Sequence, residues 1–102
     1  MHERRRSIRY PFVAGAEIIE GLGAVHQARV TDLSIYGCHL AVANSLSKGT
    51  SIIVKIRTSN RYFEAEAMVA HSSPTGMGIE FQRIAPPFVA VLQEWLGIKA
   101  LL

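Results

Sequence analysis

Apolar and polar residues alternate along most of the chain, with the period of two that is typical of half-buried β-strands. In the clearest run Ile52, Val54 and Ile56 lie on one face, and basic residues lie on the other. Residues 62–69 alternate in the same way. Further strands are predicted at residues 12–20, 24–33, 38–42 and 77–81. Six short strands predict an all-β-dominated fold, either a closed antiparallel barrel or a sandwich.

Glycine, proline and short polar residues separate the strands, as turns require. Turns are predicted at residues 21–23, 34–37, 44–49, 58–60 and 71–76. Gly49 lies at a position suited to positive φ, and Pro74 lies in the last of these turns. The turn at residues 34–37 interrupts the alternation between the second and third strands.

The C-terminal part of the chain changes to a helical period. Pro86 and Pro87 can open a helix, because the first helical turn needs no backbone amide donors. Apolar residues then recur at helical spacing, namely Phe88, Val91, Leu92, Trp95 and Leu96. Gly97 is a suitable C-cap. The pattern predicts a helix over residues 86–97 whose apolar stripe covers either the open end of a barrel or the surface of a partner protein.

The length of 102 residues corresponds to one domain, and the 49% of hydrophobic residues indicate a globular chain. No apolar stretch approaches the roughly 20 residues of a membrane-spanning helix, and no hydrophobic signal segment follows the basic start. We therefore expect a single cytoplasmic domain without membrane insertion. It would consist of a flexible arm at residues 1–10, a barrel at 11–83 and the helix at 86–97.

The net charge of +3 is concentrated in the first ten residues, which hold four arginines and one glutamate. Seven basic residues balance seven acidic residues in the rest of the chain. A cationic arm on a neutral body favours an anionic partner bound at one end. It does not favour a nucleic-acid interface, which would interleave aromatic residues with basic ones.

The arginines of the arm are candidate ligand contacts. Arg5 and Arg9 are separated by three residues, and Arg4 and Arg6 flank Arg5. A guanidinium can donate two parallel hydrogen bonds to O6 and N7 of guanine or to two phosphate oxygens, and it can stack on a base. The alternative is a solvated basic tail.

A second constellation lies at the 34–37 turn. Asp32 could accept hydrogen bonds from N1 and N2 of guanine, Ser34 could bond a phosphate oxygen, and Gly37 would allow close backbone approach. Alternatively, Asp32 and Ser34 only stabilise a tight turn through hydrogen bonds from side chain to backbone. The residues alone do not separate these two interpretations.

An RxxxR arm followed, after a strand pair, by DxSxxG resembles the two-part signature of the PilZ family. The resemblance covers nearly the whole chain, including the GMGIEF sequence at residues 76–81 and the closing helix. It implies a six-stranded antiparallel β-barrel with a C-terminal α-helix that binds cyclic di-GMP. The motif positions match Arg5 and Arg9 as guanine and phosphate contacts, and Asp32, Ser34 and Gly37 as contacts from the barrel.

The arginine ahead of the motif adds a further expectation. Arg4 is similar to the residue of family members that hold a stacked pair of cyclic di-GMP molecules, and Arg6 is a further phosphate contact without a motif position. The resemblance implies a receptor that orders its arm on binding and signals to an as yet unidentified downstream protein. The alternative is a PilZ-like interaction module that does not bind nucleotide. The oligomeric state stays open.

An enzyme is not expected. The four histidines are scattered, and none shares a ligand-like spacing with Cys38 or with another histidine, so neither a metal site nor a catalytic group is predicted. Cys38 and His39 are adjacent in a predicted strand and would point to opposite faces. Cys38 is therefore interpreted as a buried packing residue.

Overall fold

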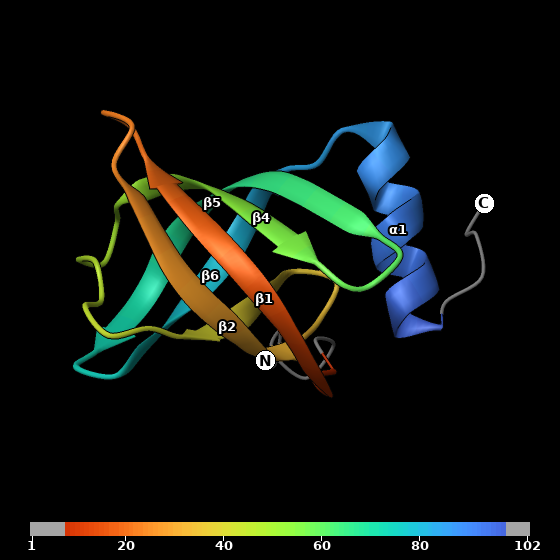
Figure 1. Cartoon of the computed structure of the whole chain (residues 1–102), viewed down its shortest axis with the longest axis horizontal. Helices are drawn as coiled ribbons and strands as arrows, with labels where there is room; N and C mark the ends of the chain where they lie inside the picture. Colours follow the sequence, from red (N-terminus) through yellow and green to blue (C-terminus); the bar gives the residue numbers. More distant parts are fainter. Residues whose placement is uncertain (1–7, 98–102) are drawn as a thin grey trace, which may run out of the picture.

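The computed structural model describes residues 8–97. Its elements are β1 (Tyr10–Glu20), β2 (Val25–Leu33), β3 (Gly37–Ala41), β4 (Ser51–Arg57), β5 (Tyr62–Ser73), β6 (Gly76–Arg83) and α1 (Pro86–Leu96). The strands close into an antiparallel barrel in the order β1-β2-β3-β6-β5-β4. The helix lies at one end of the barrel, away from the β1–β2 turn (Figure 1). The prediction of six antiparallel strands and a C-terminal helix is confirmed, and closure of the sheet decides for the barrel over the sandwich.

The alternating residues of the sequence form the core of the barrel. Ile52, Val54 and Ile56 of β4 point inward and are at most 4% exposed, while Ser51 and Arg57 at its ends are exposed. The alternate residues of β5, starting with Phe63, are buried in the same way. This burial pattern follows from the period of two, because a closed barrel has one inner and one outer face.

The apolar stripe of α1 covers the open end of the barrel. Leu92 is 4% exposed and belongs to the same buried cluster as the strand residues. The ring of Trp95 lies 5.0 Å from that of Phe12 and 5.9 Å from that of Phe63, and Phe88 lies 6.3 Å from Phe63. Gly97 ends the helix with a left-handed φ of 69°. The first of the two predicted uses of the stripe is thus the one observed. Among residues 8–97, no helix is both long and apolar enough to cross a membrane.

The predicted turn at residues 71–76 is wrong in its extent. β5 continues to Ser73, so that only Pro74 and Thr75 separate it from β6. A bulge after Val69 shifts the register and lets the pairing with β6 continue beyond it. Proline and glycine marked the turn correctly, but backbone hydrogen bonding to the neighbouring strand decided where it begins.

Cys38 is buried inside the barrel, as predicted, and His39 lies on the outer face. Burial raises the pKa of the Cys38 thiol, because the thiolate would lose its hydration, and the nearby Asp32 carboxylate acts in the same direction. Arg9 opposes both effects. The thiol therefore keeps its proton at pH values where a free cysteine begins to ionise.

This protonation state predicts the reactivity of the thiol. At pH 8 the folded protein is expected to react with a disulfide reagent at least about 100-fold more slowly than the same chain in guanidinium chloride, because only an exposed thiolate attacks. Release of the coloured thiol product measures both rates. A fast stoichiometric reaction of the folded protein would show that residue 38 is accessible.

Candidate functional site

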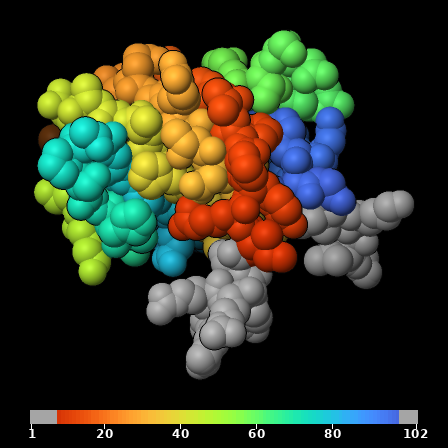
Figure 2. Space-filling view, turned by 90° about the horizontal axis from the view of Figure 1, so that it is seen from below, coloured from red at the N-terminus to blue at the C-terminus, as the bar shows by residue number. Residues whose placement is uncertain are grey.

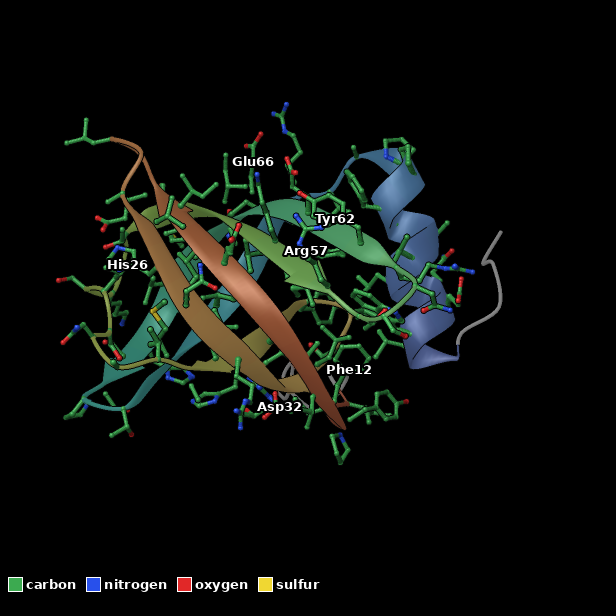
Figure 3. The ribbon with its side chains drawn as sticks, in the orientation of Figure 1. Phe12, His26, Asp32, Arg57, Tyr62 and Glu66 are labelled. Carbon is green, nitrogen blue, oxygen red and sulfur yellow. The ribbon has the colours of Figure 1, made fainter. Side chains whose placement is uncertain are left out.

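The residues before β1 meet the end of β2 through an ion pair. Arg9 Nη1 donates a hydrogen bond of 2.6 Å to Asp32 Oδ1, across 23 positions of sequence. The two side chains are 50% and 31% exposed, so both remain open to a ligand. Figure 3 shows Asp32 at the end of β2 that lies beside the beginning of β1. The structure thus brings together Arg9 of the RxxxR motif and Asp32 of the DxSxxG motif.

Strand pairing places Asp32 at this position. It lies opposite Pro11 of β1 and His39 of β3, and both pairings contain a bulge close by, after Pro11 and after Val30. A bulge adds a residue to one strand and redirects its side chains, a feature common beside binding sites. β1 itself begins at Tyr10, two residues earlier than the alternation predicted, which holds Arg9 next to the barrel.

Ser34 uses its hydroxyl group to build the turn after β2. Its Oγ accepts the backbone N–H groups of Tyr36 (3.1 Å) and Gly37 (3.2 Å) and donates to the Gly37 carbonyl (3.3 Å). Only 3% of Ser34 is exposed. The turn-stabilising interpretation of Ser34 is therefore observed, since all three bonds remain within the turn. A direct phosphate contact by Ser34 stays a prediction.

Gly37 lies where the backbones of β3 and β6 meet. A Cβ atom on Gly37 would lie 1.9 Å from the carbonyl oxygen of Ile79, closer than any side-chain atom can approach. The next residue on β6, Glu80, is its partner in the strand register. Glycine is thus required here by close backbone packing, in a strand conformation that does not itself demand glycine.

A shallow pocket of about 110 Å³ opens beside the Arg9–Asp32 pair. Its walls come from Arg9, from Tyr36 of the turn, from His71 of β5 and from Glu80 of β6. The segment that begins at Ile8 crosses this side of the molecule next to β2 and β3, as the red and orange-to-yellow atoms of Figure 2 show. The pocket therefore combines groups from four separate parts of the chain, with one cationic and one anionic side chain.

His71 is one of the pocket residues that the sequence did not predict as part of a site. His71 and His39 are far apart in the sequence, so their proximity in space could not be predicted. Their rings lie 6.3 Å apart in a stacked arrangement. The two histidines flank Gly78 in the strand register. The alternation of glycine in GMGIEF was the available clue, because glycines on the outer face leave space for neighbouring rings. Within residues 8–97, no three metal-binding side chains come together.

Three of the predicted arm residues, Arg4, Arg5 and Arg6, lie outside the described residues. The structure thus places Arg9, Asp32, Ser34 and Gly37 at one junction of the barrel.

The structure is therefore a small β-barrel domain with a polar pocket on its outer surface. The model of the PilZ domain family matches residues 3–97. The chain belongs to the PilZ family, whose members are binding and regulatory modules.

Several solved structures share the fold. The chain is similar to the inhibitor of motility (MotI/DgrA) of Bacillus subtilis, with 23% identity and a TM-score of 0.76 over 92% of this chain and 50% of that chain. It is also similar to the PilZ domain of YcgR from Escherichia coli with c-di-GMP, with 15% identity and a TM-score of 0.77. This match covers 93% of this chain and 90% of that chain. The PilZ domain of CeSA from a cellulose-synthesizing bacterium is also similar, with 16% identity and a TM-score of 0.71. The match covers 89% of this chain and 97% of that chain.

This chain spans about half the length of the Bacillus subtilis protein. No curated protein matches it. At these low identities the structural likeness supports the barrel fold alone.

Proposed function

We propose that this protein is a receptor for cyclic di-GMP that binds the nucleotide beside the Arg9–Asp32 pair. The observation that carries the proposal is the pairing of these two side chains next to a pocket whose lining includes Gly37 and Gly78. Arginine and aspartate together complement guanine, since a guanidinium donates to O6 and N7 while a carboxylate accepts from N1 and N2. Membership of a family of binding modules supports this use of the pair.

In the proposed complex, Arg9 and Arg5 contact the guanine and phosphate groups, and Asp32 accepts the N–H groups of a guanine. Ser34 holds the turn that precedes β3. Gly37 contributes through its backbone, because the missing side chain lets β3 lie close against Ile79 of β6 beside the ligand. Arg4 provides for a second, stacked ligand molecule, and Arg6 for a further phosphate contact. No metal or other cofactor takes part.

The proposed response is ordering of residues 1–10 over the ligand. Ordering about ten residues has an entropic cost, which the arginine contacts must exceed. The bound arm changes the surface offered to a downstream protein in the cytoplasm, so that the signal is a change of shape. Equal hydrogen exchange of the arm with and without cyclic di-GMP would contradict this mechanism.

Calorimetric titration with cyclic di-GMP tests the receptor proposal, with GTP as the control ligand. The wild type is expected to bind cyclic di-GMP selectively with a micromolar or lower Kd. Arg5→Ala, Arg9→Ala and Asp32→Ala should each weaken binding by about 10-fold to 100-fold, because each removes a charge-assisted hydrogen bond to the ligand. The stoichiometry, and its change in Arg4→Ala, shows whether a stacked pair binds.

Arg29→Ala is the matched control, because Arg29 is an exposed arginine of β2 that does not line this pocket. It should bind as the wild type does. A micromolar site would add over 2 kcal/mol of stability at a ligand concentration of about 100 μM. Absence of both heat and a thermal shift at that concentration would refute the receptor proposal and favour an interaction module without nucleotide.

A further inference from the structure

Strand β2 extends beyond its neighbour β3, and this difference leaves part of one edge open. β2 comprises nine residues and β3 five. Their pairing covers residues 29–33 of β2 and stops at Ala41 of β3. Val42 then donates its backbone N–H to the carbonyl of Thr75 at 3.2 Å. The chain turns away from β2 toward the β5–β6 turn here (Figure 1), so residues 25–28 have a strand neighbour only on the side of β1.

The hydrogen-bond pattern shows which backbone groups face this open edge. Successive residues of an antiparallel strand direct their N–H and C=O groups alternately to its two sides. The Glu20 N–H donates to the Ala24 carbonyl at 3.0 Å, so Ala24 and then every second residue along β2 point these groups at β1. Val25 and Gln27 therefore point theirs to the open side. Within residues 8–97, the backbone of neither residue forms a hydrogen bond on that side.

A groove of about 500 Å³ lies against the open edge. One wall is formed by residues 27–29 of β2, and the other by residues 41–43 and Thr75. Val42 belongs to the buried core, and Ala28 packs against the same core, so the side of the groove nearest the core is apolar. The groove thus combines small apolar side chains with unpaired backbone groups along one wall.

We propose that an extended, acidic segment of a partner protein binds in this groove and adds a strand to the edge of β2. An added strand would satisfy the N–H and C=O groups of Val25 and Gln27, because its own backbone groups repeat every two residues, or about 7 Å. The edge of another folded barrel fits less well, since the wall at residues 41–43 stands in front of the edge in each copy. The inference goes beyond the proposed function and does not depend on nucleotide binding.

The side chains beside the groove define the chemistry of the segment. A residue opposite Ala28 on the added strand would point toward the core and must be small or aliphatic. A residue opposite Gln27 would point outward and have Arg29 as its diagonal neighbour. Arg29 is exposed and forms no ion pair with any of residues 8–97. Glu17, beyond Gln27 on β1, already faces Lys55 of β4. A carboxylate on the segment would therefore pair with Arg29.

Amide hydrogen exchange of the full chain tests whether the edge is open. In the protein alone, the N–H groups of Val25 and Gln27 should exchange at least about 100-fold faster than those of His26 and Ala28, which face β1. Nuclear magnetic resonance resolves the four rates. If Val25 and Gln27 were as well protected as His26 and Ala28, the edge would be closed and the proposal overturned.

A capped peptide of six alternating valine and glutamate residues is the probe for binding. We expect a Kd below about 1 mM. At about ten times the Kd, exchange of the Val25 and Gln27 amides should slow by about 10-fold. Three valines followed by three glutamates should leave both amides unprotected, because this order breaks the alternation. Lysine in place of glutamate should weaken binding by about 10-fold, and Arg29→Glu should reverse that preference.

Gln27→Pro separates docking from folding. The N–H that proline removes faces the open edge, so no hydrogen bond to β1 is lost and the Tm should stay within about 5 °C of the wild type. Peptide binding should weaken by at least about 10-fold. Ala28→Pro is the matched control, because it removes an N–H that faces β1. It should lower the Tm by more than about 10 °C.

The remaining outcomes decide between occupants of the edge. Peptide binding that leaves the exchange of Val25 and Gln27 unchanged, or equal binding by Gln27→Pro and the wild type, would overturn the proposal. Protection of both amides without peptide, rising with protein concentration, would assign the edge to a second copy of the chain and overturn it as well. Each measurement is made without cyclic di-GMP, so failure here leaves the receptor proposal intact.

Discussion

Gly37→Ala is expected to lower the free energy of unfolding by about 2–3 kcal/mol and to remove cyclic di-GMP binding. The new Cβ atom would lie 1.9 Å from the carbonyl oxygen of Ile79, and this neighbour belongs to the backbone of β6, so no rotation of a side chain relieves the contact. Strands β3 and β6 must separate. The displacement reaches the turn, because Gly37 donates to and accepts from Ser34.

Gly15→Ala is the matched control for this prediction. Gly15 is also a strand glycine without positive φ, and a Cβ atom there would have no neighbour within 4 Å. Alanine at this position should change stability by less than about 0.5 kcal/mol, or raise it slightly by restricting the unfolded chain. Urea titration followed by circular dichroism measures both variants. Equal stabilities of the two variants would show that β3 and β6 can separate at little cost.

Phe63→Ala is expected to destabilise the protein by about 3–5 kcal/mol, the largest effect of a single substitution in the core. Phe63 is fully buried, and its ring contacts Phe81 from β6 and Trp95 and Phe88 from α1. Removing it leaves a cavity between the barrel and the helix, which neither element can fill without moving. Trp95 is the single tryptophan, so its fluorescence reports the transition at this interface.

Leu22→Ala is the control for the core substitution, because Leu22 is a large apolar residue that is fully exposed in the β1–β2 turn. It should change the free energy of unfolding by less than about 0.5 kcal/mol. If Phe63→Ala unfolded at the same urea concentration as the wild type, the predicted cost of the cavity would be wrong. Coincident transitions by tryptophan fluorescence and circular dichroism would indicate a single unit of barrel and helix.

Local pattern determined much of the fold. Ile52, Val54 and Ile56 alternate because one side of each barrel strand faces the core, and this requirement is visible in any stretch of sequence. Gly49 and Gly97 adopt the positive φ expected from their places in a turn and at a helix end. The ends of the strands were harder to predict from the sequence, since the pairing of β5 with β6 past Val69 depends on hydrogen bonds to a distant segment.

The candidate site was predictable in part. The order and spacing of RxxxR and DxSxxG identified Arg9 and Asp32 as candidates, although the residues alone left a basic tail and a simple turn as alternatives. The structure shows that the Ser34 hydroxyl forms hydrogen bonds within the turn, as the second of these alternatives predicted. The position of His71 in the pocket was not predictable, because its sequence surroundings resemble a turn and its neighbours in space lie on other strands.

The sequence by itself determined the strand and helix pattern, the family and the motif residues, because these depend on side-chain period and on spacing along the chain. Only the tertiary structure decided that α1 covers the barrel, that Arg9 pairs with Asp32, and that His71 lies in the pocket beside this pair. Closure of the barrel is the physical reason. It brings β1 beside β2 and β4, and β6 between β3 and β5, so that residues far apart in sequence share one surface.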